Sequence, residues 1–298
     1  PKAAKNPVEV QGARAAQRRD GAAMARFLAW LAGEAPKGRL TERDAAARID
    51  ALRAEDPLFV EPSFATVSAA GPHSALPHYR PSPATDRPIR PGELYLTDSG
   101  GQYLDGTTDV TRTIAVGTPS TEMRDRFTRV LRAHIALATA RFPEGTRGGH
   151  LDGIARRPLW EAGLDFGHGT GHGVGSYLNV HEGPQSISTA SASAPFSAGV
   201  IISNEPGYYQ DGAFGIRIEN LLVAVPVLPA SEDGRRFLAF ETLTAVPIDL
   251  ALVEASLLAA DEIAWLDRYH AFVREAILPL LQGQEADWLL GATRPLAP

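Results

Sequence analysis

The chain has 298 residues, 44% hydrophobic and 21% charged, which is typical of a folded globular protein and excludes a disordered or fibrous one. Its net charge is −6, with acidic and basic residues interspersed, so a nucleic-acid-binding surface is not expected. The absence of cysteine excludes disulfides and thiolate metal sites, and no apolar run approaches the ~20 residues that span a bilayer. These properties favour a cytoplasmic protein that contacts neither membrane nor nucleic acid.

Two helices are predicted near the start of the chain. Asp20 is a candidate N-cap for the first, which would bury apolar residues at helical spacing, namely Met24, Phe27, Leu28 and Leu31. Thr41 with Asp44 resembles a capping box for the second helix. Residues 62–92 are rich in Pro, Gly and Ser, so loops with short strands are expected there.

Strands are predicted in the middle of the chain. Residues 93–97 lead into Asp98, and the β-branched run 109–116 begins at Asp109. Residues 165–224 again combine strands with glycine-rich turns. Each half of this region therefore carries a strand pair with two acidic residues beside helical sequence. We expect a duplicated α+β architecture with a site between the two halves.

Helical segments flank these strands. One helix is expected to start at Ser120 or Thr121 and to stop near Pro143, and a shorter one to cover 150–162. The last segment, from Ser256 to about Gln284, is predicted to be one helix, because apolar residues recur along one side of it: Ile263, Leu266, Tyr269, Phe272, Val273, Ile277 and Leu280.

The acidic residues are spaced so that hairpins can bring them together. Asp98 and Asp109 are eleven residues apart, and Glu205 and Glu219 are fourteen apart, with the turn sequence Asp211-Gly212 midway. In the first pair the turn sequence Asp105-Gly106 is off-centre, so an irregular loop or bulge is expected there. Opposed residues in a hairpin share one face of the sheet at ~4.5–5.5 Å. Two carboxylates so placed repel each other unless a cation lies between them. Two such pairs in one domain indicate a metal site.

Nearby histidines strengthen this interpretation. His168, His172 and His181 lie in one glycine-rich run, where the backbone can approach other groups closely. The alternative is that some of the acidic residues point to solvent and pair with Arg112 or Arg217. Residue types alone do not choose between these alternatives for a single pair.

The charges of the candidate ligands match two metal ions. Four carboxylates balance two divalent cations, and one imidazole completes the set. Ligation dominated by oxygen suits Mn²⁺, while the imidazole also admits Zn²⁺ or Co²⁺. Two metals ~3.5–4 Å apart can hold a bridging hydroxide and polarise a scissile carbonyl. Peptide hydrolysis is then one option among several.

Three blocks around these residues, 98–113, 168–184 and 205–220, resemble the aminopeptidase P branch of the creatinase/methionine aminopeptidase superfamily. The resemblance extends from about residue 12 to the end of the chain. It implies an α+β pita-bread fold, in which a curved antiparallel sheet has helices outside and two halves are related by a pseudo-twofold axis.

The resemblance also implies a role for each ligand. Asp98 corresponds to the terminal ligand of one metal, and Asp109 and Glu219 correspond to bridging ligands. His172 and Glu205 correspond to ligands of the other metal. In this branch the usual metal is Mn²⁺.

Further residues are implied to act on the substrate. His78 corresponds to a substrate-binding histidine, and His168 and His181 to those that hold the peptide and stabilise the tetrahedral intermediate. Glu205 is the candidate for moving a proton from the bridging water to the leaving nitrogen. Arg217 is expected to orient a ligand carboxylate.

The implied function is that of a dinuclear-metal aminopeptidase. It would hydrolyse the N-terminal Xaa-Pro bond of peptides with proline second, using a metal-bridging hydroxide as nucleophile. One alternative is a prolidase, which cleaves only Xaa-Pro dipeptides. The other is a catalytically inactive pita-bread domain that binds protein partners.

The predicted organisation is a catalytic domain over 12–228 with a C-terminal extension over 236–298 packed on it. Aminopeptidases P carry one or two further domains upstream, and this chain, which begins at Pro1, is expected to lack them. The extension contributes to a dimer in the relatives. A homodimer through this region is therefore expected, unless its apolar stripe packs on the catalytic domain.

Overall fold

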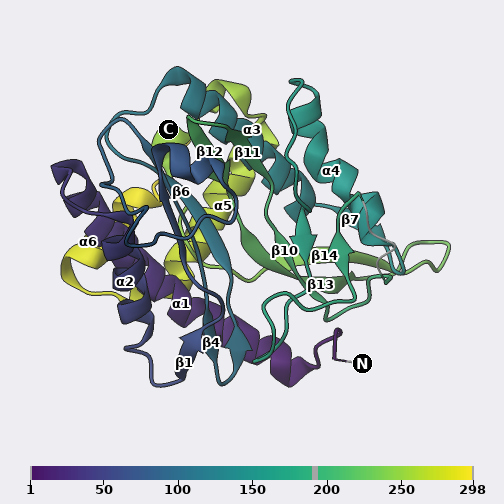
Figure 1. Cartoon of the computed structure of the whole chain (residues 1–298). Coiled ribbons are helices and arrows are strands. Elements are labelled where there is room, and N and C mark those ends of the chain that lie inside the picture. The colour runs from purple at the N-terminus through teal and green to yellow at the C-terminus, as the bar shows by residue number, and fades with distance from the viewer. Residues whose placement is uncertain (1, 190–193, 297–298) are drawn as a thin grey trace.

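The computed structural model describes residues 2–189 and 194–296, so residues 297–298 of the predicted extension lie outside the described part. Within it, antiparallel sheets are covered by helices (Figure 1). One sheet has the order β2–β3–β6, with bounds Val67–Ala70, Leu94–Ser99 and Val110–Ala115. The other has the order β10–β13–β14–β7, with bounds Ile201–Asn204, Asn220–Val227, Phe237–Thr242 and Arg141–Pro143.

Shorter strands complete the two hairpins that carry the acidic residues. The β3–β6 hairpin ends in β4 (Gly101–Tyr103) and β5 (Gly106–Thr107), and β4 also pairs with β1 (Phe59–Pro62). The β10–β13 hairpin ends in β11 (Gly207–Gln210) and β12 (Phe214–Arg217). A separate short pair is formed by β8 (Gly171–His172) and β9 (Ser186–Ile187).

The α-helices of the described part pack on these strands. Their bounds are α1 Pro7–Glu34, α2 Glu42–Arg53, α3 Thr121–Ala138, α4 Gly148–Trp160, α5 Ala260–Ile277 and α6 Gly283–Ala292. One core joins α3, α5 and β12 through buried residues that include Phe127, Leu266 and Ile216. Another packs α1 and α2 against β3. None of these helices combines the length and apolar character that a membrane span requires.

The first helix begins earlier than predicted, and Asp20 is not its N-cap. The helix starts after Asn6, whose side chain accepts hydrogen bonds from the backbone N–H groups of Val8 and Glu9, both at 2.9 Å. Asp20 lies buried inside α1 and pairs with Arg53 of α2, with Oδ1 2.6 Å from Nε. The polar residue beside the apolar stripe is therefore an ion-pair partner rather than a helix start.

Two other helix boundaries differ from the predictions. The helix expected to stop near Pro143 ends earlier, because residues 141–143 form β7 and Phe142 is buried in the core of its sheet. The single helix predicted over 256–284 is divided into α5 and α6. Pro279 lies between them and has no backbone N–H to donate to a continuous helix. Tertiary pairing explains the first difference and local chemistry the second.

The two hairpins meet along β6. The backbone N–H of Glu219 donates to the carbonyl of Thr111 at 3.1 Å. The backbone N–H of Arg217 donates to Oγ1 of Thr113 at 3.0 Å. Figure 1 shows β6 and β10 near the middle of the view, with α2 and α6 on one side and α4 on the other. The acidic residues of both halves therefore converge on this junction.

Candidate metal centre

Asp98 and Asp109 lie on one hairpin but are not directly opposite each other. In the β3–β6 register Asp98 pairs with Thr111. The hairpin turns at residues 104–105, one position beyond the midpoint of the two aspartates. A turn that is displaced by one residue moves the pairing partner of each strand residue by two positions. Asp109 therefore lies two positions from the partner of Asp98, and the two carboxylates are diagonal neighbours on one face of the sheet. Direct opposition is therefore wrong for this pair. The bulge expected from the off-centre turn signal is also wrong, because β3–β6 and β4–β5 share one continuous register.

Glu205 and Glu219 are opposed, as predicted. The β10–β13 register pairs Asn204 with Asn220, so the next two positions are the glutamates. The β11–β12 ladder continues the same register beyond them. The turn lies midway, and Gly212 has the left-handed φ of 69° that glycine adopts at little cost. The central turn explains why this pair could be predicted.

One cavity, of about 520 Å³, gathers all the residues predicted to form the site. These residues are His78, Asp98, Asp109, His168, His172, His181, Glu205 and Glu219. Arg217 lines the cavity as well, together with Phe64 and Arg80. The fold thus brings together segments that are up to 141 positions apart in the chain, from residue 78 to residue 219.

Asp109, His172 and Glu219 form a tight group of potential ligands, because one atom from each lies within 4.8 Å of the others. The Nε2 of His172 lies 3.4 Å from Asp109 Oδ2 and 3.4 Å from Glu205 Oε1. The Nδ1 of His172 lies 3.0 Å from the Gly173 carbonyl, to which it can only donate. In the neutral imidazole this leaves the Nε2 lone pair for a metal ion.

Hydroxyl groups hold two of the carboxylates. Thr111 donates to Glu219 Oε2 at 2.6 Å, and Ser203 donates to Glu205 Oε1 at 3.0 Å. Ser203 also accepts the backbone N–H of His172 at 2.9 Å. The sequence interpretation missed both hydroxyls. Each lies two positions from an acidic residue along a strand, and side chains at that spacing share a face, which is the signal that could have found them.

Asp98 is held by an arginine that is connected through Tyr209 to a histidine of the cavity. Arg217 donates from Nη2 to Asp98 Oδ2 at 2.6 Å and from Nη1 to the Tyr209 hydroxyl at 2.8 Å. That hydroxyl lies 2.8 Å from His168 Nε2, and His168 Nδ1 lies 2.8 Å from the Gly169 carbonyl. Tyr209 therefore donates to His168. Arg217 contacts a carboxylate of the site as expected, whereas the connecting Tyr209 was not predicted.

The histidines predicted to contact substrate differ in how free their rings are. His78 and His181 are exposed on the cavity wall, and the His181 ring lies edge-on to His172 with centroids 4.1 Å apart. His168 is half-buried, with both ring nitrogens engaged within the chain. A ligand can therefore reach His78 and His181 directly, whereas the His168 ring is held by the Gly169 carbonyl and the Tyr209 hydroxyl.

The electrostatics of the site favour a cation. Burial, helped by the charge of Asp98 and opposed by the contact with His172, raises the pKa of Asp109 to about 7. Burial and the charge of Asp109 raise the pKa of Glu219 well above its usual range. Burial lowers the pKa of His172, but Asp109 and Glu205 outweigh it and raise the pKa to about 9. A divalent cation would displace the protons that these shifts retain.

Two carboxylate oxygens indicate where such a cation fits. Asp98 Oδ1 and Asp109 Oδ1 are buried and have no hydrogen-bond partner within residues 2–189 and 194–296. Buried acceptors normally have a partner, and free carboxylate oxygens are the ligands that hard divalent cations prefer. Together with Nε2 of His172, these oxygens make a donor set that fits divalent metal ions.

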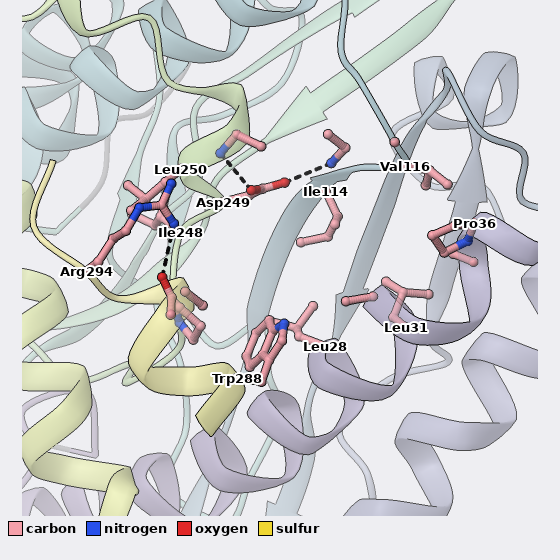
Figure 2. A pocket seen from close by; sticks show the side chains of 18 residues that line it. Leu28, Leu31, Pro36, Ile114, Val116, Ile248, Asp249, Leu250, Trp288 and Arg294 are labelled. Carbon is pink, nitrogen blue, oxygen red and sulfur yellow. Dashed lines mark hydrogen bonds between the residues drawn. The ribbon is translucent and has the colours of Figure 1, made fainter. Parts of the chain in front are cut away.

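A second cavity, of about 450 Å³, lies at the opposite end of β6 (Figure 2). It is lined by the end of α1, the end of β6 and α6, mostly with apolar side chains such as Leu28, Ile114 and Trp288. Asp249 faces it, but its oxygens accept the backbone N–H groups of Ala115 and Ala251, both at 2.9 Å. That carboxylate therefore stabilises the chain fold, and the titratable cluster belongs to the first cavity.

Comparisons with known proteins agree with this geometry. The chain matches Metallopeptidase family M24 over residues 11–226 and the C-terminal region of peptidase M24 over residues 236–296. It is 51% identical to Aminopeptidase P2 of Arabidopsis thaliana over 300 residues, which cover 99% of this chain and 42% of that protein. The chain spans about half the length of the curated relatives it matches.

Solved structures give the same result. An X-prolyl aminopeptidase from Caenorhabditis elegans, described as a cytosolic enzyme with a di-nuclear active site, superposes with a TM-score of 0.95 at 44% identity. The match covers 99% of this chain and 49% of that one. A Xaa-Pro dipeptidase from Bacillus anthracis superposes with a TM-score of 0.69 at 28% identity, over 84% of this chain and 64% of that one.

The α+β architecture with two acidic hairpins is the pita-bread fold predicted from the sequence. The chain belongs to metallopeptidase family M24. The predicted resemblance to the aminopeptidase P branch is confirmed, because the Arabidopsis and C. elegans relatives carry that name or its equivalent.

Proposed function

We propose that this chain carries the catalytic site of a dinuclear-metal aminopeptidase that hydrolyses the bond between an N-terminal residue and a following proline. The observation that carries the proposal is the cavity in which five potential ligands converge: Asp98, Asp109, His172, Glu205 and Glu219. The names of the relatives support the reaction, because one is an aminopeptidase P and another an X-prolyl aminopeptidase with a di-nuclear active site.

Each ligand is proposed to have the role that the family resemblance implies. Asp98 would hold one metal ion, His172 and Glu205 would hold the other, and Asp109 and Glu219 would be shared by both. The 3.4 Å distances from His172 to Asp109 and to Glu205 support this division. Two divalent ions in such a site supply Lewis acidity and lower the pKa of a water molecule so that it can attack at neutral pH.

The other side chains bind the peptide and move protons. Glu205, oriented by Ser203 at 3.0 Å, takes a proton from the attacking water and returns it to the departing proline nitrogen. His78 and His181 are exposed on the cavity wall and donate to oxygens of the substrate that become more negative during attack. The ring of His168, oriented by the Tyr209 hydroxyl at 2.8 Å, completes the peptide-binding wall of the cavity.

The similarity favours an aminopeptidase over a prolidase. The aminopeptidase from C. elegans aligns with 99% of this chain at a TM-score of 0.95, against 84% and 0.69 for the dipeptidase. The complete set of potential ligands also disfavours an inactive binding module.

Several finer properties belong to the same proposal. The oxygen-rich donor set favours Mn²⁺, with Zn²⁺ or Co²⁺ as the other candidates. The proposed domains are 12–228 and a C-terminal extension, 236–298, whose helix α5 shares the core of the strands. Exposed Leu280 and Leu290 in that extension support a homodimer through it. A cytoplasmic location is proposed because the C. elegans enzyme is cytosolic.

Cleavage of matched peptides by the Mn²⁺-loaded protein tests this function. Release of alanine from Ala-Pro-Ala should be faster than from the dipeptide Ala-Pro. Equal or faster cleavage of the dipeptide would favour a prolidase. Full metal loading without cleavage of either peptide would favour a binding module.

A further inference from the structure

The segment that carries His78 is fixed from behind at two points. Tyr79 is buried, and its hydroxyl donates to Glu42 Oε2 of α2 at 2.8 Å. Glu42 is itself fully buried. On the other side, the Pro77 carbonyl accepts from Nη2 of Arg217 at 3.4 Å. The segment is therefore held both to the helical layer and to the candidate metal centre.

This anchoring decides which side chains face the cavity. Tyr79 points toward α2, where its ring also packs on His73 with centroids 4.3 Å apart. Its two neighbours, His78 and Arg80, are exposed and line the cavity of the metal centre. Arg80 is thus presented to the same space as a residue proposed to bind substrate.

The two arginines that line this cavity have different environments. Arg217 is 2% exposed, and its guanidinium is occupied by Asp98 and Tyr209. Arg80 is exposed and makes no ion pair or side-chain hydrogen bond within the part of the chain that the structure describes. Its permanent positive charge is therefore available to a ligand.

The depth of the cavity suggests which part of a peptide Arg80 meets. The potential bridging ligands Asp109 and Glu219 are only 3% and 2% exposed, so they form the floor. A scissile bond at the floor places residues beyond the proline toward the exposed wall, where Arg80 lies.

We propose that Arg80 is a specificity residue that binds a carboxylate on the leaving side of the substrate. That carboxylate is the free C-terminus of a tripeptide or an acidic side chain in the third position of a longer peptide. A guanidinium pairs with a carboxylate through two parallel hydrogen bonds. The inference rests on the proposed aminopeptidase function and adds a substrate class to it.

Matched peptides that differ only in this charge test the proposal. Ala-Pro-Ala is compared with its C-terminal amide, and Ala-Pro-Glu amide with Ala-Pro-Gln amide. For a partly exposed ion pair, kcat/KM of the charged member of a pair should be higher by about fivefold. An effect in the first pair alone assigns the C-terminal carboxylate, and one in the second pair extends the site to acidic side chains.

Variants connect the preference to this residue. Arg80→Ala should bring the acid-to-amide ratio of kcat/KM close to one, Arg80→Lys should retain part of it, and Arg80→Glu should reverse it. Arg90→Ala is the matched control, because Arg90 is exposed, follows in the same loop and does not line the cavity. Its ratio should equal that of the wild type. A wild-type ratio near one, or an unchanged ratio in Arg80→Ala, would overturn the proposal.

A binding measurement separates this inference from the proposed function. Calorimetric titration of the product Pro-Ala and its amide into wild type and Arg80→Ala needs no turnover. The acid should bind about fivefold more tightly than the amide to wild type only. Cleavage of all peptides without discrimination, and equal binding of both products, would overturn the role of Arg80 alone. Failure to cleave any Xaa-Pro peptide would overturn the function instead.

Discussion

Arg112 donates from Nη1 to the backbone carbonyl of Glu219 at 2.7 Å. The same guanidinium is 1% exposed and donates from Nη2 to Asn220 Oδ1 at 2.7 Å and to the hydroxyl of Tyr269 at 2.9 Å. Tyr269 belongs to α5, so the C-terminal region is hydrogen-bonded to the segment that bears a potential bridging ligand. Arg112 therefore supports the backbone beside the centre rather than pairing with an acidic side chain there.

Removal of the Tyr269 hydroxyl should weaken this support. Tyr269→Phe removes a buried hydroxyl that donates to the Val246 carbonyl at 2.7 Å and accepts from Arg112 at 2.9 Å. Loss of such a hydrogen bond typically costs about 0.5–1.5 kcal/mol in the free energy of unfolding, since Asn220 and the Val246 carbonyl remain as acceptors for Arg112 Nη2. We also expect weaker Mn²⁺ binding, because the Glu219 backbone is less restrained. Urea denaturation and calorimetric metal titration measure the two effects. Tyr177→Phe, at an exposed tyrosine, is the control for unfolding, and equal values for both variants would contradict the prediction.

The buried pair between Asp20 and Arg53 can be tested against the helix-cap role. Asn is as good an N-cap as Asp, so Asp20→Asn would be almost neutral if Asp20 capped a helix. Asp20 instead forms a buried ion pair with Arg53 at 2.6 Å. Asp20→Asn should therefore lower the free energy of unfolding by about 3–5 kcal/mol. Asn6→Ala, at the observed cap, should cost about 1 kcal/mol. A larger loss of unfolding free energy in Asn6→Ala than in Asp20→Asn, measured by urea denaturation, would rule out the buried ion pair.

Asp109→Asn removes a potential ligand with almost no change in shape. Substitution of residues that only hydrogen-bond to metal ligands typically lowers activity or metal affinity by about 10–100-fold. Asp109 is itself a potential ligand, so turnover of Ala-Pro-Ala should fall by more than about a hundredfold. Mn²⁺ bound per chain, measured by elemental analysis, should fall in parallel. Asp211→Asn is the control, because Asp211 is exposed at the tip of the other hairpin. Full metal content in Asp109→Asn would exclude the ligand role.

Tyr209→Phe should affect turnover without stripping metal. The substitution removes the hydroxyl that donates to His168 and accepts from Arg217, both at 2.8 Å. We expect kcat to fall by about 10–100-fold, as for other residues that orient a metal centre. Metal content should stay at the wild-type value. An unchanged kcat would show that catalysis does not need the connection between His168 and Arg217 through the Tyr209 hydroxyl.

The position of each turn decided how much of the site could be predicted. The loop between Glu205 and Glu219 is centred on Gly212, and their opposition followed from spacing and a turn signal. In the first hairpin the turn lies off-centre, so Asp98 and Asp109 are displaced relative to each other, although both line the cavity. Turn chemistry is local and can be predicted, whereas a one-residue shift of register depends on how the whole hairpin packs.

Long-range contacts explain most of what was missed. The pairing of Asp20 with Arg53 and the chain from His168 through Tyr209 to Arg217 join residues from different elements. A polar residue beside an apolar stripe fits a helix cap or a buried ion pair equally well until the partner is known. A role for Arg80 likewise could not be predicted from the sequence, because it depends on the cavity that the guanidinium lines.

Anomalous diffraction from crystals grown with Mn²⁺ tests the dinuclear centre most directly. Two peaks are expected between Asp109 and Glu219, one of them also bound by Asp98 and the other by His172 and Glu205. A single peak at full occupancy, or His181 in place of His172 as the imidazole ligand, would contradict the proposed centre.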